Sequence, residues 1–242
     1  MRAGEPKPGP RLAVLVASTA LLPWAAAWLP GGRWWLPFAL VAAVFPEFAR
    51  RVRAGDVAKA WRWGMAWAFC LSASTVILTL WHPQRAEVTV LQGTDYRDEM
   101  FRWIETGVGK EGNPARFLPE HALHLLAFVV LCWTTGGIGG LVLGAVLTGY
   151  MSFFVGSFAA ASRSPWVGSL VAWFPWSVAR VSAFVLAGVL LARPLLTRRL
   201  WPWTRADLRW FAWVAAGLAV DVVLKTLLAP SYGRWFARWF VE

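Results

Sequence analysis

The sequence predicts an all-α fold: a polytopic membrane helix bundle of about seven transmembrane helices, with one short amphipathic helix on the membrane surface. Of the 242 residues, 58% are hydrophobic and 15% are charged, whereas a soluble domain has about 45–50% apolar and about 25% charged residues. The apolar residues gather in long uncharged runs, comparable to the ~20 residues that cross a hydrocarbon core. Many of the 19 tryptophans fall near the ends of these runs, where the indole ring favours the headgroup region.

The excess of basic residues is a topology signal. The net charge is +11, and the lysines and arginines cluster in short loops beside the apolar runs. That pattern is typical of cytoplasmic loops and of contact with anionic headgroups. We therefore expect the lipid bilayer, and other membrane subunits, as partners, and no nucleic acid. The two cysteines, Cys70 and Cys132, fall inside apolar runs, so no disulfide framework is predicted.

The first half of the chain contains three predicted spans. Residues 1–10 include three prolines and are predicted to form a disordered tail, with residues 11–242 as a single integral membrane domain. The spans are expected at about residues 12–29, 34–48 and 63–81. Pro30-Gly31-Gly32 predicts a tight turn between the first two, because proline ends a helix and glycine permits a positive φ.

A polar segment at residues 82–120 separates the two halves, and it holds seven of the thirteen acidic residues. Within it, Tyr96, Met100, Trp103 and Ile104 recur at helical spacing and form one apolar stripe. We expect a short helix there that lies on the membrane surface.

The second half predicts four more spans, at about residues 121–135, 138–160, 166–192 and 208–228. Gly136-Gly137 would join the first two of these. If residues 117–161 instead form one crossing plus a re-entrant segment, the total is six.

The distribution of lysine and arginine predicts the orientation. Three basic residues precede the first span, five follow the second and five follow the sixth. Even numbers of spans separate these groups, so all three can face the cytoplasm. In a bacterial inner membrane, the N-terminus would then be cytoplasmic, and residues 82–120 and the C-terminus would lie outside.

The first candidate site is on the outward face, where the topology places His82, His121 and His124. His121 and His124 are three residues apart and share a helix face, with Glu120 beside them. Imidazole and carboxylate groups are suitable ligands for zinc or iron, so His121 and His124 are candidate metal ligands. The alternative is that these histidines lie at the interface because they tolerate both water and lipid.

The second candidate site consists of charges inside apolar runs. Arg180 and Asp221 fall near the middle of consecutive spans, where an unpaired charge costs about 2.5–3.5 kcal/mol. We expect the two to pair, with Lys225, one turn from Asp221, extending outward to the interface. The pair is either a structural bridge or part of a proton, anion or headgroup site.

The third feature is the glycine pattern Gly136, Gly140 and Gly144. On one continuous helix these residues would form a helix-packing face, a glycine zipper. The alternative is that the glycines break the helix, as in the half-helices of transporters.

Three functions fit these features. An accessory or transporter-like protein that handles a lipid or a small hydrophobic substrate is favoured, because the sequence shows neither a nucleotide motif nor a complete catalytic set. The first alternative is a metal-dependent membrane enzyme that uses Glu120, His121 and His124. The second is a helical scaffold subunit of a larger membrane complex, which a glycine face would suit.

Overall fold

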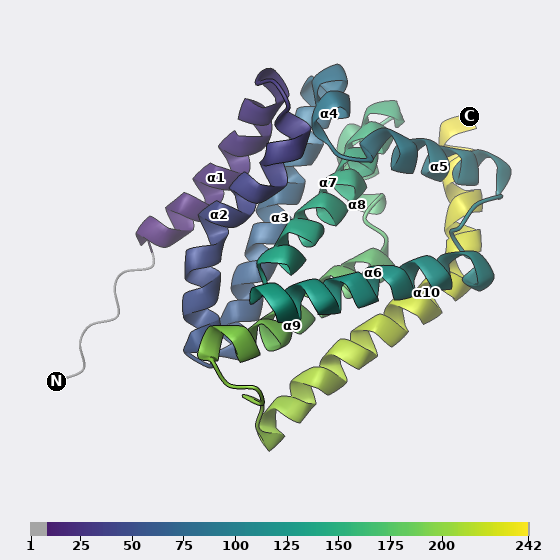
Figure 1. The fold of residues 1–242 in the computed structure, drawn as a ribbon. Helices are drawn as coiled ribbons and strands as arrows, with labels where there is room; N and C mark the ends of the chain where they lie inside the picture. Colours follow the sequence, from purple (N-terminus) through teal and green to yellow (C-terminus); the bar gives the residue numbers. More distant parts are fainter. Residues whose placement is uncertain (1–8, 242) are drawn as a thin grey trace.

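The computed structural model describes residues 9–241, and within them the chain is all-α (Figure 1). Seven helices have 20 or more residues: α1 (Gly9–Trp28), α2 (Gly32–Arg53), α3 (Val57–Trp81), α6 (Pro114–Thr135), α7 (Ile138–Ala161), α9 (Pro175–Thr197) and α10 (Leu208–Val241). The short elements are α4 (Pro83–Thr89), α5 (Gly93–Thr106), α8 (Pro165–Val171) and the 3-10 turn η1 (Arg205–Asp207). Most of the predicted N-terminal tail lies outside the described residues, but Gly9 and Pro10 already belong to α1.

Six of the long helices, α1, α3, α6, α7, α9 and α10, are long and apolar enough to cross a membrane. The chain is therefore a multi-pass helical membrane protein. The exception is α2, which has an uncharged middle but carries Glu47, Arg50, Arg51 and Arg53 in its last two turns. It packs inside the bundle against α1, α3, α7 and α9. A membrane crossing by α2, and with it the count of seven spans, stays a prediction.

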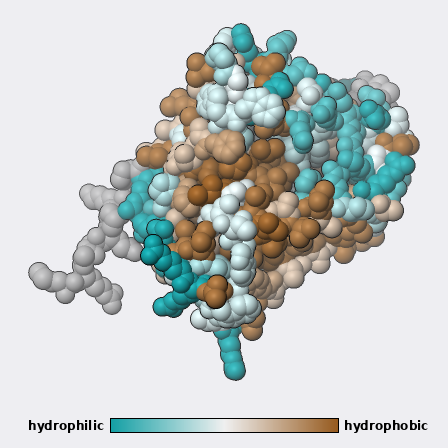
Figure 2. All heavy atoms as spheres, in the orientation of Figure 1, coloured by the Kyte–Doolittle hydropathy of each residue, from teal (hydrophilic) through white to brown (hydrophobic). Residues whose placement is uncertain are grey.

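The surface of the bundle is divided by polarity. Figure 2 shows apolar residues over a broad central area, with hydrophilic residues gathered beyond it, around α5 and the start of α6 at one end and near the end of α2 at the other. Among the described residues, large apolar side chains such as Phe69, Leu21 and Leu227 are mostly exposed. Such a surface is suited to contact with lipid tails between two polar ends.

The tryptophans follow the predicted belt in part. Trp28, Trp81 and Trp166 lie near helix ends and are largely exposed, as expected of interfacial residues. In contrast, Trp67 and Trp176 are buried in the protein core. The excess of tryptophan therefore serves packing as well as the interface.

The predicted join between α6 and α7 is confirmed, and the helices on either side of it are each long and apolar enough to cross a membrane. Gly136 and Gly137 both have positive φ, 62° and 96°, and the Gly137 N–H donates to the Cys132 carbonyl at 2.9 Å, which closes α6. The glycine zipper is wrong as a continuous face, because Gly136 lies in this turn, outside both helices. Gly140 instead lies against the Cys132 sulfur, and Gly144 has open space in front of it.

The span predicted at residues 166–192 is wrong, because two helices replace it. The chain ends α8 at Val171 and begins α9 at Pro175, the first helical position, with Phe174 in an extended conformation (ψ 137°). Proline fits at a helix start and pushes the residue before it out of the helical region. Arg180 consequently lies in the second turn of α9, not in the middle of a span.

The predicted short helix exists as α5, but its apolar stripe does not face lipid. Met100, Trp103 and Ile104 are buried, since α5 crosses the end of the bundle and packs on α7 and α10 (Figure 1). The indole of Trp103 meets the ring of Phe174 edge-on, with centroids 6.2 Å apart. An aromatic cluster of the protein thus covers the stripe that we expected the membrane surface to cover.

Candidate functional site

A cavity of about 570 Å³ lies between α3, α5, α6, α7, α9 and α10. Its volume is within the range of about 300–1,000 Å³ that is typical of small-molecule sites. Along α6 its lining runs from Phe117 to Cys132, which at 1.5 Å per residue is roughly 22 Å of helix. The cavity is therefore long enough to follow much of a membrane crossing.

The lining changes from polar to apolar along this length. At the end near α5 are charged and hydroxyl-bearing residues: Asp95, Tyr96, Glu99, Lys110, Glu111, Glu120, His121, His124, Tyr150, Arg180, Asp221 and Lys225. Toward the α6–α7 turn the lining consists mainly of apolar residues, among them Phe48, Trp67, Phe128, Cys132, Leu141 and Phe184. The cavity thus has an ionic end and an apolar body.

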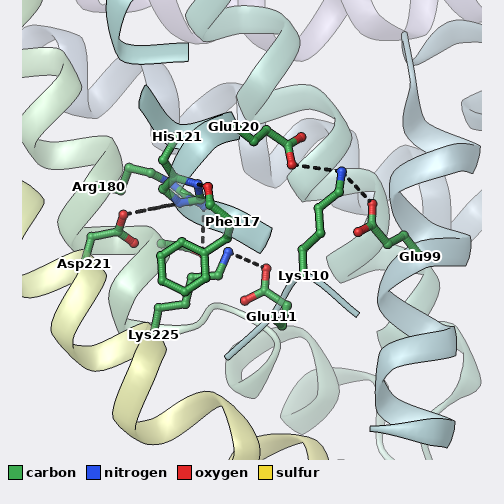
Figure 3. A network of polar contacts seen from close by, with 10 residues as sticks. Glu99, Lys110, Glu111, Phe117, Glu120, His121, Arg180, Asp221 and Lys225 are labelled. Atoms are coloured by element: carbon green, nitrogen blue, oxygen red, sulfur yellow. Dashed lines mark hydrogen bonds and ion pairs between the residues drawn. The ribbon is translucent and has the colours of Figure 1, made fainter. Parts of the chain in front are cut away.

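His121, Arg180 and Asp221 meet at the ionic end (Figure 3). The guanidinium of Arg180 makes a short contact through Nη1 with Nε2 of His121. Asp221 Oδ2 lies 3.5 Å from His121 Nε2 and 3.9 Å from Arg180 Nη1. These residues come from α6, α9 and α10, so the cluster ties three helices together.

The partners of His121 determine its protonation. Nδ1 lies 3.0 Å from the Phe117 carbonyl oxygen, which only accepts, so Nδ1 carries the proton. A guanidinium only donates, so Nε2 accepts from Arg180. His121 is therefore neutral with both ring nitrogens engaged, and the negative charge of Asp221 has only Arg180, at the longer distance, as a close counter-ion in this group.

A second ion pair lies one turn further along α10. Lys225 Nζ is 2.8 Å from Glu111 Oε1 and 4.6 Å from the centroid of the Phe117 ring. The Lys225 side chain is only 3% exposed, so the prediction that it extends outward to the interface is wrong. It has no need to do so, because the loop between α5 and α6 brings a carboxylate to it (Figure 3).

Lys110, in the loop between α5 and α6, links these two helices through ion pairs at the ionic end of the cavity. Its Nζ is 2.8 Å from Glu120 Oε2 and 3.3 Å from Glu99 Oε2. The hydrogen bond with Glu120 raises the pKa of Lys110, against the effect of burial. Nearby on α5, burial raises the pKa of Tyr96 well above its ordinary value, so this residue presents a neutral hydroxyl.

The structure joins residues that the sequence assigned to two sites. Glu120, His121 and His124, predicted at the outward face, line the same cavity as Arg180, Asp221 and Lys225. His82 is not brought to them: it lies at the junction of α3 and α4, with its ring 5.6 and 5.8 Å from those of Trp24 and Trp28. His82 is therefore not part of the candidate site, whereas Arg180, Asp221 and Lys225 are.

The geometry gives no support to zinc or iron at His121 and His124. Among the described residues, no group of three or more histidine, cysteine, aspartate or glutamate side chains is placed to hold a metal ion. His121 has no free nitrogen to offer, since Phe117 and Arg180 use both.

Glu111 is one of the site residues that sequence reasoning missed; Asp95, Lys110 and Tyr150 are others. Glu111 sits in a loop with glycines at residues 107, 109 and 112, where no periodicity predicts its position. One signal was present: a lysine deep in an apolar run needs an acidic partner, and the polar segment at residues 82–120 is rich in carboxylates.

Comparisons with protein-family models, with curated proteins and with solved structures found no match to this chain. The cavity is therefore interpreted from its own chemistry.

Proposed function

We propose that this protein binds an amphipathic molecule, a lipid or a small hydrophobic compound with a polar head, and handles it as a transporter-like or accessory membrane protein. The observation that carries the proposal is the graded lining of one cavity, ionic at the α5 end and apolar along α6 and α9. An amphiphile has the same gradient, so its head would lie at the His121–Arg180 cluster and its chain along α6. Apolar lining with a few fixed polar groups is the usual character of such sites.

The depth of the ionic end supports this arrangement. His121 is seven residues from the start of α6 and Arg180 is five residues from the start of α9, which places both roughly 8–10 Å from those helix ends. Lipid headgroups meet the hydrocarbon region at comparable depths near the ends of spans. A headgroup could therefore reach the cluster while its chain stays in the apolar part.

We further propose that the ionic end faces outward from a bacterial inner membrane. The basic ends of α2 and α9 lie together, since Arg53 Nε donates to the Leu196 carbonyl at 3.3 Å, and positively charged loops remain cytoplasmic. Reporter fusions at Gly55 and Thr204 should then read cytoplasmic and a fusion at Gly112 external. An external reading at Gly55 would reverse the orientation.

Binding can be tested by native mass spectrometry of the detergent-purified protein with myristylamine, monomyristoylglycerol and myristate, which share one chain length. At least one of them should bind with a stoichiometry of one. Gly144→Phe should abolish that binding, because Gly144 lines the cavity and nothing lies within 4 Å of where a Cβ would be.

The matched control is Ala219→Phe on the exposed side of α10, away from the cavity lining. It should leave binding unchanged. If no member of the series binds, or if Gly144→Phe binds as well as the parent protein, the cavity is not the binding site and the proposal is wrong.

A further inference from the structure

Two carboxylate oxygens at the ionic end of the cavity lack partners. Asp221 Oδ1 and Glu111 Oε2 are buried and accept no hydrogen bond among the described residues. Their side chains are 2% and 9% exposed, and both residues line the cavity. A buried acceptor without a donor is destabilising, so each oxygen marks a position where a ligand that donates a hydrogen bond would be held.

The two orphan oxygens belong to carboxylates that both lie beside Lys225 (Figure 3). Asp221 and Lys225 are four residues apart on α10 and so face the same side, one turn apart. Lys225 holds Glu111 through its other oxygen, Oε1, at 2.8 Å. Both orphan oxygens therefore belong to one ionic cluster between α10 and the α5–α6 loop.

The charges around the cavity favour a cation. The described lining carries five carboxylates and three cations: Asp95, Glu99, Glu111, Glu120 and Asp221 against Lys110, Arg180 and Lys225. The cations are already engaged, Lys110 and Lys225 with carboxylates and Arg180 with His121 and Asp221. With the histidines neutral, the ionic end has an excess of two negative charges, which attracts a cation and repels an anion.

We infer that the headgroup recognised by this cavity is a primary ammonium group, carried by a single-chain or lipid-like amine. An ammonium donates three hydrogen bonds and accepts none, so it can donate to an orphan oxygen and offsets part of the excess negative charge. A hydroxyl headgroup would donate to such an oxygen without offsetting the charge. An ionised carboxylate or phosphate headgroup would do neither, because it brings acceptors and further negative charge to oxygens that need a donor.

This inference rests on the proposed amphiphile binding and deepens it, and the same chain-matched series separates the two. At pH 7 and low salt, myristylamine should bind at least about tenfold more tightly than myristate, with monomyristoylglycerol between them. If myristate binds as tightly as the amine in a manner abolished by Gly144→Phe, amphiphile binding stands and the ammonium preference is refuted. If no member of the series shows binding that Gly144→Phe abolishes, both the amphiphile-binding proposal and the ammonium preference are refuted.

Variants that change charge locate the preference at the carboxylates. Glu111→Gln should weaken amine binding roughly tenfold and leave monomyristoylglycerol nearly unchanged. Because that variant breaks a buried ion pair, Asp95→Asn is a milder second test: Asp95 is exposed, lines the cavity and should lower amine affinity about two- to threefold.

The matched control is Asp98→Asn, on the same helix but outside the lining and paired with Arg97. It should change amine affinity less than twofold. Equal effects of the Asp95 and Asp98 substitutions would show a general surface-charge effect and overturn the inference. An amine affinity insensitive to Glu111→Gln in a folded protein would overturn it as well.

Discussion

Replacing Lys225 by methionine tests the buried ion pair that closes the ionic end of the cavity. The substitution keeps the aliphatic stem against Phe117 and removes the ammonium group that lies 2.8 Å from Glu111 Oε1. Since Glu111 Oε2 already lacks a partner, the variant leaves a carboxylate with no hydrogen bond at either oxygen. Removing one member of a buried pair costs about 3–5 kcal/mol.

The loss of stability in Lys225→Met has an upper limit, and a double mutant distinguishes it from other effects. An ordinary glutamate can escape an unfavourable environment by taking up a proton, which costs about 4 kcal/mol at pH 7, so the penalty for the stranded carboxylate should not exceed that value. Removing both charges in Lys225→Met/Glu111→Leu should restore stability to within about 1 kcal/mol of the parent, because an apolar replacement of a buried pair is often neutral. The coupling energy should be about 2–3 kcal/mol.

The assay is reversible unfolding in mixed micelles of mild detergent and dodecyl sulfate, followed by tryptophan fluorescence. The matched control is the exposed pair Lys59–Asp56, which has a similar separation of 3.1 Å but side chains 53% and 38% exposed. Its coupling should be at most about 0.5 kcal/mol. If the Lys225 and Glu111 losses simply add, the two side chains do not interact and the ionic end is not built as described.

Three further predictions concern other positions. The cycle of Arg180→Gln and Asp221→Asn should show a positive coupling but a smaller one than the pair above, because the two charges are 3.9 Å apart and share a histidine; fully additive losses would refute the pairing. Asp56→Ala should cost about 1 kcal/mol because Asp56 caps α3, whereas Asp56→Asn should cost little. The hydrogen bond from the backbone of the α3 first turn lowers the pKa of Asp56 below 3.8. The stability that Asp56 contributes is therefore present above about pH 3.8 and is lost as the pH falls through the lowered pKa. A loss of stability in Asp56→Ala that stays equally large at about pH 2 to 3 would contradict this. Gly140→Ala should cost about 1–3 kcal/mol by overlapping the Cys132 sulfur, and adding Cys132→Ala should recover most of it, as measured by the same unfolding assay.

Local sequence features predicted the helices well. The long uncharged runs predicted the apolar spans, and Gly136-Gly137 predicted the turn between α6 and α7 because only glycine adopts positive φ readily. The spacing of Tyr96, Met100 and Trp103 predicted α5. These patterns could not predict which surface packs against each apolar face. The packing partners of α5, for example, come from distant parts of the chain.

The sequence led us to predict two separate sites. The reason is that we estimated the membrane depth of Arg180 within a span that the structure does not contain. With residues 166–192 taken as one crossing, Arg180 fell near mid-membrane and His121 at the outer face. Pro175 restarts the helix, and this places Arg180 near the start of α9, in contact with His121 near the start of α6. A proline within an apolar run was the available signal, since it fits best at a first helical turn.

The position of the charges bears on the roles open to the Arg180–Asp221 pair. A proton or anion pathway needs polar groups along the length of the membrane crossing. In the described lining, however, the residues of α6 beyond His124 and of α9 beyond Arg180 that face the cavity are uncharged: Leu125, Phe128, Cys132, Val181, Phe184, Val185 and Gly188. The ionic groups gather at one end because three helices and a loop bring them there, and the rest of the described lining carries no charged side chain. Such a lining is suited to holding one charged head and one apolar chain, and it is unsuited to conducting ions from one side to the other.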